Sequence, residues 1–173
     1  EGILLFTIIK YLVFMNAIYP GTFDPLTLGH EEIIHRAANI FDSVLVAVAE
    51  DTSKSTMFAL EDRLSLVEIF SSQYDNVSFS SYDGLTIDFA KSKNINIILR
   101  GARNSTDFNY ESQISQMNNA MDKSIESLFF IAADSYKSIT SSLVRQVIKL
   151  DGDYSKFLSS KVYNHLKLIR NIK

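Results

Sequence analysis

A loop near the start of the chain combines a glycine, a hydroxyl and an imidazole. Gly21, Thr22 and His30 follow a short apolar segment and precede a helical pattern, with turns marked by Pro20 and Pro25. The free N–H groups of a glycine-bearing loop and the dipole of a helix start both favour a bound phosphate. The threonine and the histidine could reach the same phosphate. We therefore predict a phosphate-handling site in this loop.

Two arginines surround a glycine further along the chain. Arg100 and Arg103 flank Gly101 and Ala102, directly after the apolar segment Ile95–Leu99. Arginine contacts phosphate oxygens in a bidentate manner and keeps its charge, and glycine lets a ligand approach the main chain. Two solvated surface arginines are the alternative interpretation. Their position at the end of a buried type of strand favours ligand binding.

A third motif is a group of hydroxyl side chains at the start of a predicted helix over Thr140–Leu150. Ser138, Thr140, Ser141 and Ser142 supply them. An ordinary helix N-cap is the alternative explanation. Lys54, in a polar loop, would by itself be interpreted as a solvated lysine.

Composition limits the kinds of protein that this chain can be. Its 173 residues fit one domain with a single core. A net charge of −3 argues against a nucleic-acid binder, which usually has a basic face. The sequence has no cysteine, which excludes disulfides and thiolate sites and fits a cytoplasmic location. Its three histidines lack metal-ligand spacing, so we expect no protein metal site and any metal to arrive with nucleotide phosphates.

The first residues differ in character from the rest. Gly2–Phe14 is almost wholly apolar, is too short to span a membrane, and lacks the features of a signal peptide. We predict that Met15 is the natural start, that residues 1–14 are a non-native or disordered extension, and that residues 15–173 form a single domain. A membrane-associating tail is the alternative.

Hydrophobic patterns then predict the elements that must position these side chains. The predicted strands are Asn16–Tyr19, Ser43–Ala49, Val77–Ser81, Ile95–Leu99 and Ser127–Ala132. The predicted helices are Glu31–Phe41, Leu60–Ser72, Leu85–Lys93, Asp107–Met121, Thr140–Leu150 and Leu158–Ile169. Strands that alternate with helices indicate an α/β fold, a doubly wound five-stranded parallel sheet with a C-terminal helix. Ligands of such sheets bind beyond the carboxyl ends of the strands, where the three motifs fall.

The motifs also resemble a known family. Residues 19–30 match Tyr-Pro-Gly-Thr-Phe-Asp-Pro-x-Thr-x-Gly-His, which resembles the opening of bacterial phosphopantetheine adenylyltransferases, members of the nucleotidyltransferase superfamily with a (His/Thr)-x-Gly-His signature. Residues 100–103 resemble the family's Arg-Gly-x-Arg. Residues 139–145 resemble Ile-Ser-Ser-(Ser/Thr)-x-x-Arg, with Thr140 in place of the first serine. The resemblance covers nearly all of residues 15–173 and implies a Rossmann-like fold.

The resemblance implies an activity. AMP would pass from ATP to 4′-phosphopantetheine, giving 3′-dephospho-CoA and pyrophosphate, by direct in-line attack without a covalent intermediate. The acceptor phosphate is already ionised, so no general base is needed, and no activated nucleophile is evident in the sequence. Two positions depart from the family: Thr86 replaces a common methionine and Gln146 a common glutamate, and both bear on acceptor affinity.

Site residues follow from the resemblance, position by position. The catalytic residues would be His30, Thr22, Lys54 and Arg103. Phosphopantetheine would contact Thr22, Lys54, Leu85, Thr86, Arg100 and Asn118. ATP would contact Gly21, Thr22, Phe23, His30, Gly101, Ala102, Arg103, Glu111, Tyr136, Lys137, Ser138, Ile139, Thr140, Ser141 and Ser142.

Further expectations concern partners. The resemblance implies Mg²⁺ held by the ATP phosphates, a homohexamer, and coenzyme A as feedback inhibitor, with no nucleic acid and no membrane as partner. The alternatives are a cytidylyltransferase or nicotinamide mononucleotide adenylyltransferase of the same superfamily, and a catalytically dead nucleotide-sensing module. The complete opening motif and the single-domain length favour the pantetheine enzyme over the first. Retention of Thr22, His30, Lys54, Arg100 and Arg103 argues against the second.

Overall fold

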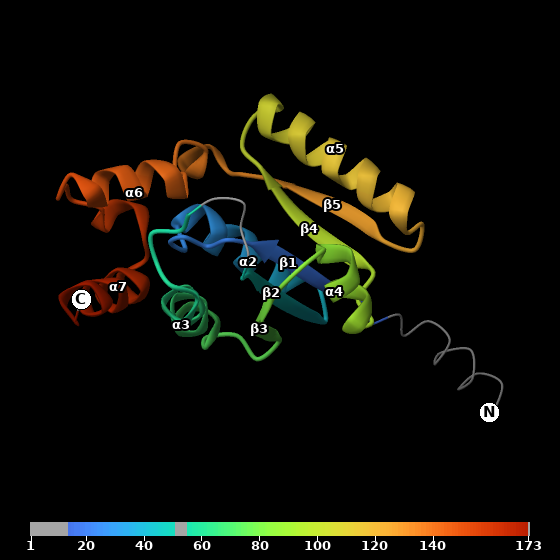
Figure 1. Cartoon of the computed structure of the whole chain (residues 1–173), viewed down its shortest axis with the longest axis horizontal. Coiled ribbons are helices and arrows are strands. Elements are labelled where there is room, and N and C mark those ends of the chain that lie inside the picture. Colours follow the sequence, from blue (N-terminus) through green and yellow to red (C-terminus); the bar gives the residue numbers. More distant parts are fainter. Residues whose placement is uncertain (1–13, 51–54, 173) are drawn as a thin grey trace.

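The computed structural model describes residues 14–50 and 55–172, and its centre is a parallel sheet (Figure 1). The strands are β1 (Asn16–Gly21), β2 (Ser43–Ala49), β3 (Val77–Tyr82), β4 (Ile97–Ala102) and β5 (Glu126–Ile131), in the order β3-β2-β1-β4-β5. All neighbouring strands are parallel. The predicted five-stranded α/β sheet is confirmed. The predicted extension lies almost wholly outside the described residues, as does Lys54.

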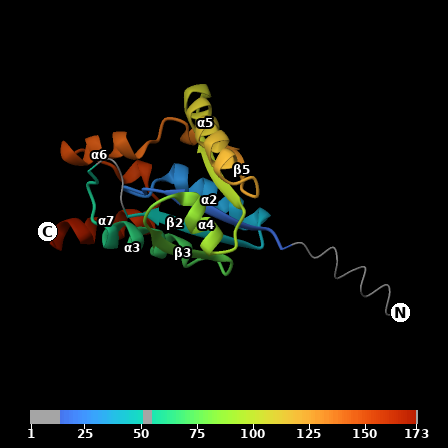
Figure 2. The ribbon, with the colours of Figure 1, turned by 45° about the vertical axis from the view of Figure 1, so that its right-hand side comes forward.

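Helices cover both faces of this sheet. They are α2 (Leu28–Ile40), α3 (Leu60–Ser71), α4 (Thr86–Ser92), α5 (Ser105–Met121), α6 (Ser141–Lys149) and α7 (Ser160–Ile172), with short 3₁₀ turns at Asp134–Tyr136 and Ser155–Phe157. The larger core packs α2, α3, α6 and α7 against one face, through residues such as Ala17, Leu66 and Leu166. The smaller core packs α4 against the other face, around Ile18 and Ile98. Figure 2 shows α5 alongside β4 and β5.

The sheet opens between β1 and β4. β1 pairs with β2 along its whole length, from Asn16 to Gly21, but with β4 only at Ala17 and Ile18. β4 in turn pairs with β5 over all of its residues. The carboxyl ends of the two central strands therefore part at the point where the strand order reverses, which is where doubly wound sheets bind ligands.

Several predicted boundaries differ from the structure by one to three residues, and three of these differences concern a binding motif. β1 does not break at Pro20 but continues through Gly21, because its ladder with β2 persists after that with β4 has ended. α2 begins at Leu28 rather than at Glu31, so His30 lies within its first turn. Arg100 belongs to β4 rather than following it. The motifs are thus more firmly built into regular structure than the sequence indicates. None of the described helices is long and apolar enough to cross a membrane.

Candidate active site

A cleft of about 970 Å³ lies at the carboxyl ends of β1 and β4. Sixteen predicted site residues line it: Gly21, Thr22, Phe23, His30, Leu85, Thr86, Arg100, Gly101, Ala102, Arg103, Glu111, Asn118, Ile139, Thr140, Ser141 and Ser142. Tyr136, Lys137 and Ser138 are not part of its lining, and Lys137 forms an ion pair with Asp134. Lys54 lies outside the described residues. The fold thus brings together residues that are far apart in the chain, such as Asp24 and Arg145, which are 121 positions apart.

His30 is held in one tautomer by the loop that precedes it. The main-chain N–H of Thr27 donates to His30 Nδ1 at 3.1 Å, and the Thr27 hydroxyl lies 3.1 Å from the same nitrogen. A nitrogen that accepts an N–H bond carries no proton, so the hydrogen of the neutral ring sits on Nε2. Burial, aided by the positive charge of Arg103, lowers the pKa of His30 to about 4. At neutral pH this residue is therefore an uncharged hydrogen-bond donor in the cleft wall.

The loop between β1 and α2 is rigidly packed. Phe23 is buried with a φ of 50°, a left-handed backbone conformation that a bulky residue rarely adopts. Its ring packs edge-on against Tyr19 and His30, with centroid distances of 5.5 and 5.1 Å. A side chain at Gly21 would come within 2.9 Å of the Phe23 ring. The glycine therefore lets the phenylalanine support the imidazole.

The other side of the cleft holds polar atoms without partners. Arg100 Nε and Glu111 Oε2 lie 3.5 Å apart as an ion pair, and both side chains are largely buried. Neither atom has a hydrogen bond within the described residues, and the buried Nδ2 of Asn118 has none either. Burial raises the pKa of Glu111, and Arg100 opposes this shift. Buried polar groups normally find partners, so a ligand in the cleft would complete these three.

Arg103 stands at the start of α5 with its direction fixed. Its Nε donates to Asp107 Oδ2 at 2.7 Å. Asp107 is held in turn by the helix cap, because its N–H donates to Asn104 Oδ1 at 2.8 Å. The carboxylate occupies only one edge of the guanidinium. The remaining N–H groups stay available to an anion in the cleft.

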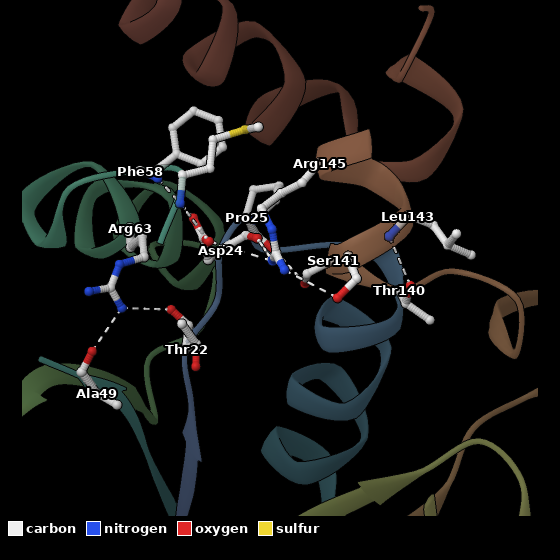
Figure 3. Close-up of polar contacts among 12 residues, drawn as sticks. Thr22, Asp24, Pro25, Ala49, Phe58, Arg63, Thr140, Ser141, Leu143 and Arg145 are labelled. Carbon is white, nitrogen blue, oxygen red and sulfur yellow. Dashed lines mark hydrogen bonds and ion pairs between the residues drawn. The ribbon is translucent and has the colours of Figure 1, made fainter. Parts of the chain in front are cut away.

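The start of α6 is tied to the loop after β1 (Figure 3). Ser141 Oγ donates to the carbonyl of Pro25 at 3.0 Å, and Arg145 Nη1 donates to the carbonyl of Asp24 at 2.6 Å. Arg145 also forms an ion pair with the Asp24 carboxylate at 3.5 Å and donates to Ser142 Oγ at 3.2 Å. The first and last motifs of the sequence therefore form one continuous wall, in which most polar groups already have protein partners.

Comparison with known proteins identifies the family. A cytidylyltransferase-like family model matches residues 18–147. The phosphopantetheine adenylyltransferase of Paraburkholderia xenovorans (strain LB400) is 42% identical over 151 residues, which cover 87% of this chain and 88% of that protein. That of Lachnoclostridium phytofermentans (strain ATCC 700394 / DSM 18823 / ISDg) is 41% identical over 145 residues, covering 84% and 89%. The chain belongs to the phosphopantetheine adenylyltransferase family.

Solved structures of lower identity support the same fold. The nicotinic acid mononucleotide adenylyltransferase of Plasmodium falciparum, solved as a complex with NaAD, has a TM-score of 0.69 at 14% identity and covers 90% of this chain and 96% of its own. A lipopolysaccharide core biosynthesis protein from Thermoplasma volcanium GSS1 has a TM-score of 0.52 at 21% identity, covering 69% and 98%. Both likenesses concern the fold alone. Family membership confirms the resemblance found in the sequence.

Several residues of this family member's cleft were missed from the sequence. Tyr19, Asp24, Thr27 and Arg145 line it, although all four belong to the quoted motifs and could have been included on that ground. Burial raises the pKa of Tyr19, so its phenol remains protonated in the cleft wall. Tyr82 also lines the cleft, and its hydroxyl lies 3.0 Å from Thr86 Oγ1. No local sequence signal distinguishes Tyr82 from an ordinary strand-end tyrosine.

Proposed function

We propose that this chain transfers AMP from ATP to 4′-phosphopantetheine, forming 3′-dephospho-CoA and pyrophosphate. The observation that carries the proposal is that His30, Arg100 and Arg103 converge in one cleft, in a chain of the phosphopantetheine adenylyltransferase family. Donors from β1–α2, β4 and α6 surround a volume large enough for a nucleotide and an extended acceptor.

The reaction is a direct displacement at the α-phosphorus of ATP. An oxygen of the acceptor phosphate forms a bond to this phosphorus, while the bond to the oxygen that bridges to the β-phosphorus breaks and pyrophosphate leaves with that electron pair. The acceptor is ionised at neutral pH, so no protein base is required. Catalysis then depends on alignment and on stabilising the charge around the phosphorus.

His30 is the proposed stabiliser of the α-phosphate. Its Nε2–H is the proton of a neutral imidazole whose Nδ1 is occupied by Thr27. A preorganised donor of this kind acts without rotating or changing charge during the reaction. Arg103 and the hydroxyls of Ser141 and Ser142 would hold the leaving pyrophosphate, with the remaining predicted ATP contacts around them.

The acceptor would lie on the opposite side of the α-phosphate. Thr22 and Lys54 would orient its attacking phosphate, and Arg100 would neutralise charge. The pantetheine arm would pass Leu85, Thr86 and Asn118, which line the cleft near α4 and α5. Thr86 brings a hydroxyl where the family commonly has methionine, and this favours a polar contact to an amide of the arm.

Mg²⁺ would enter with ATP and be held mainly by phosphate oxygens. Within residues 14–50 and 55–172 there is no cluster of three acidic or histidine ligands. Among the cleft carboxylates, Asp24 accepts the N–H groups of Met57 and Phe58. Glu111 forms an ion pair with Arg100, although its Oε2 has no hydrogen bond within the described residues. The ion would neutralise charge on the pyrophosphate as it leaves.

Assembly and regulation are part of the same proposal. Tyr110, Met117 and Met121 on α5 are 64, 65 and 53% exposed, an apolar surface that suits contacts between copies of the chain, and we propose a homohexamer. Coenzyme A carries the same pantetheine arm as the acceptor and would compete for the cleft as a feedback inhibitor. We place the enzyme in the cytoplasm. A monomer by light scattering at micromolar concentration would contradict the hexamer.

The deciding experiment measures pyrophosphate release from ATP and magnesium, with and without 4′-phosphopantetheine. We expect release that depends on the acceptor, with 3′-dephospho-CoA detected by mass spectrometry. CTP in place of ATP, and nicotinamide mononucleotide in place of the acceptor, should give little turnover. Preference for either substitute would indicate another activity of the superfamily. Tight ATP binding without any turnover would indicate a nucleotide-sensing module.

A further inference from the structure

Arg63 is a buried charge that stands behind the cleft rather than in its lining. It belongs to α3 and is only 2% exposed. Its Nη1 donates to the carbonyl of Thr22 at 2.9 Å and to the carbonyl of Ala49 at 2.8 Å (Figure 3). Burying a guanidinium costs free energy unless its contacts compensate, so this position demands an explanation.

The two carbonyls lie where the pairing of β1 with β2 ends. The ladder between β1 and β2 ends with Gly21 paired to Val48. Thr22 and Ala49 are the next residue on each strand, and their carbonyls meet the same nitrogen of Arg63. The guanidinium therefore continues the connection between the strands for one residue beyond the backbone ladder.

A second connection holds the same two segments together further on. The Asp24 carboxylate accepts the N–H of Met57 at 2.8 Å and that of Phe58 at 2.9 Å. The loop that follows β1 is thus attached at two separate places, through Arg63 to the end of β2 and through Asp24 to the chain after β2. Thr22 lies at the first of these attachments. The Arg63 attachment involves no residue of β4, α5 or α6, whereas Asp24 also binds Arg145 of α6.

We propose that Arg63 is a positioning residue for the acceptor phosphate, acting through the main chain of Thr22. It fixes the separation of the β1 and β2 ends and hence the place of the Thr22 hydroxyl relative to His30. This inference rests on the proposed function. Arg103 is held independently, by Asp107. Ser141 bonds to the carbonyl of Pro25, whose neighbour Asp24 keeps its own attachment to Met57 and Phe58 when Arg63 is lost. Loss of Arg63 should therefore impair acceptor binding and leave the binding of ATP nearly unchanged.

Steady-state kinetics with each substrate varied in turn would test this. We expect Arg63→Gln to raise the KM for 4′-phosphopantetheine about tenfold or more, because two bonds from a charged donor are lost. The KM for ATP should stay within about twofold on the same reasoning. Arg63→Lys keeps a buried cation that reaches one carbonyl. Its KM for 4′-phosphopantetheine should therefore lie between that of the parent enzyme and that of Arg63→Gln. Arg170→Gln on α7, where the guanidinium lies 5.6 Å from the Tyr154 ring, is the control and should show no such difference.

A double-mutant cycle with Thr22→Val separates positioning from a general structural role. If Arg63 acts through Thr22, Arg63→Gln should have little further effect on the acceptor KM once the hydroxyl is gone. Equal increases of both KM values, or full additivity in the cycle, would overturn the inference while parent turnover stands. A parent enzyme without acceptor-dependent turnover would overturn the proposed function first. If neither Arg63 variant folds, as judged by thermal unfolding, the residue is structural and the inference fails.

Discussion

The two sides of the cleft are built in opposite ways. One side, the tied wall, consists of Asp24, Ser141 and Arg145, whose side chains already bond to the protein, and of Thr22, whose main-chain carbonyl does so. The other, the open wall, consists of Arg100, Glu111 and Asn118, each with a buried polar atom that has no hydrogen-bond partner. The first wall holds reacting groups in place before substrate arrives. The second leaves bonds to be made by substrate, at a cost to the stability of the free protein.

This contrast predicts that changes in the tied wall damage the fold, while changes in the open wall damage binding. The largest effect should come from Asp24→Ala, which leaves two main-chain N–H groups without an acceptor and removes the carboxylate that pairs with Arg145. We expect the free energy of unfolding to fall by about 3–5 kcal/mol, measured by urea denaturation. Asp153→Ala is the matched control, because its carboxylate accepts the N–H of Ser155 at 2.9 Å on the surface. Equal losses for both variants would remove the distinction between the walls.

His30 should matter for turnover more than for binding. We expect His30→Ala to lower kcat by roughly a hundred- to a thousandfold, equivalent to about 2.7–4 kcal/mol, with little change in the KM for ATP. The reason is that a fixed Nε2–H contributes mainly where charge develops on the α-phosphate. Single-turnover measurements of AMP transfer would check this. Turnover within a few-fold of the parent would exclude His30 as the stabiliser.

The same residue makes stability depend on pH. The folded pKa of His30 is about 4, below the ordinary value of 6.5, so between these values the unfolded chain binds more protons. The stability that this neutral imidazole confers is fully present above pH 6.5 and is lost as the pH falls towards 4. At pH 5 the loss should be at most about 2 kcal/mol relative to pH 8. In His30→Gln the free energy of unfolding should depend less on pH between 4 and 6.5. Parallel curves of unfolding free energy against pH for the parent and the variant would contradict the lowered pKa of His30.

Much of the fold could be predicted because its signals are local. Continuous apolar runs such as Ser43–Ala49 indicate strands buried on both faces, and their alternation with amphipathic helices fixes the parallel topology. The boundaries at Gly21 and Leu28 could not be predicted, because proline and glycine usually mark breaks. Here a neighbouring strand and a helix cap override that preference. A tertiary contact, the ladder with β2, decided the first position, and a local contact between Thr27 and His30 decided the second.

The site residues likewise fall into those with a local sequence signal and those that depend on tertiary contacts. Residues within motifs, such as Thr22, His30 and Arg103, were recognisable because each motif is contiguous in sequence, and the cleft lining includes them. Arg63 was not recognisable, because its two carbonyl partners belong to other elements and carbonyls leave no trace in side-chain patterns. The assignment of Lys54 stays a prediction.

The open wall yields the smallest predicted change and the sharpest test of the comparison. Asn118 is 7% exposed and its Nδ2 lacks a partner, so Asn118→Leu removes a buried donor that the free protein does not use. We expect the free energy of unfolding to stay constant or to rise by about 1 kcal/mol, while the KM for 4′-phosphopantetheine rises roughly fivefold to tenfold. Urea denaturation and initial-rate kinetics on the same preparation would measure both.

Asn119→Leu is the neighbouring control on the same helix. Asn119 Nδ2 lies 3.5 Å from the carbonyl of Ile125, and its residue is absent from the cleft lining. Its replacement should lower stability slightly and leave the acceptor KM unchanged, the reverse of the Asn118 result. If Asn118→Leu instead destabilised the protein as Asp24→Ala does, the amide would have a structural partner. The open wall would then be as fully bonded as the tied one, and acceptor binding could not depend on its unpaired atoms.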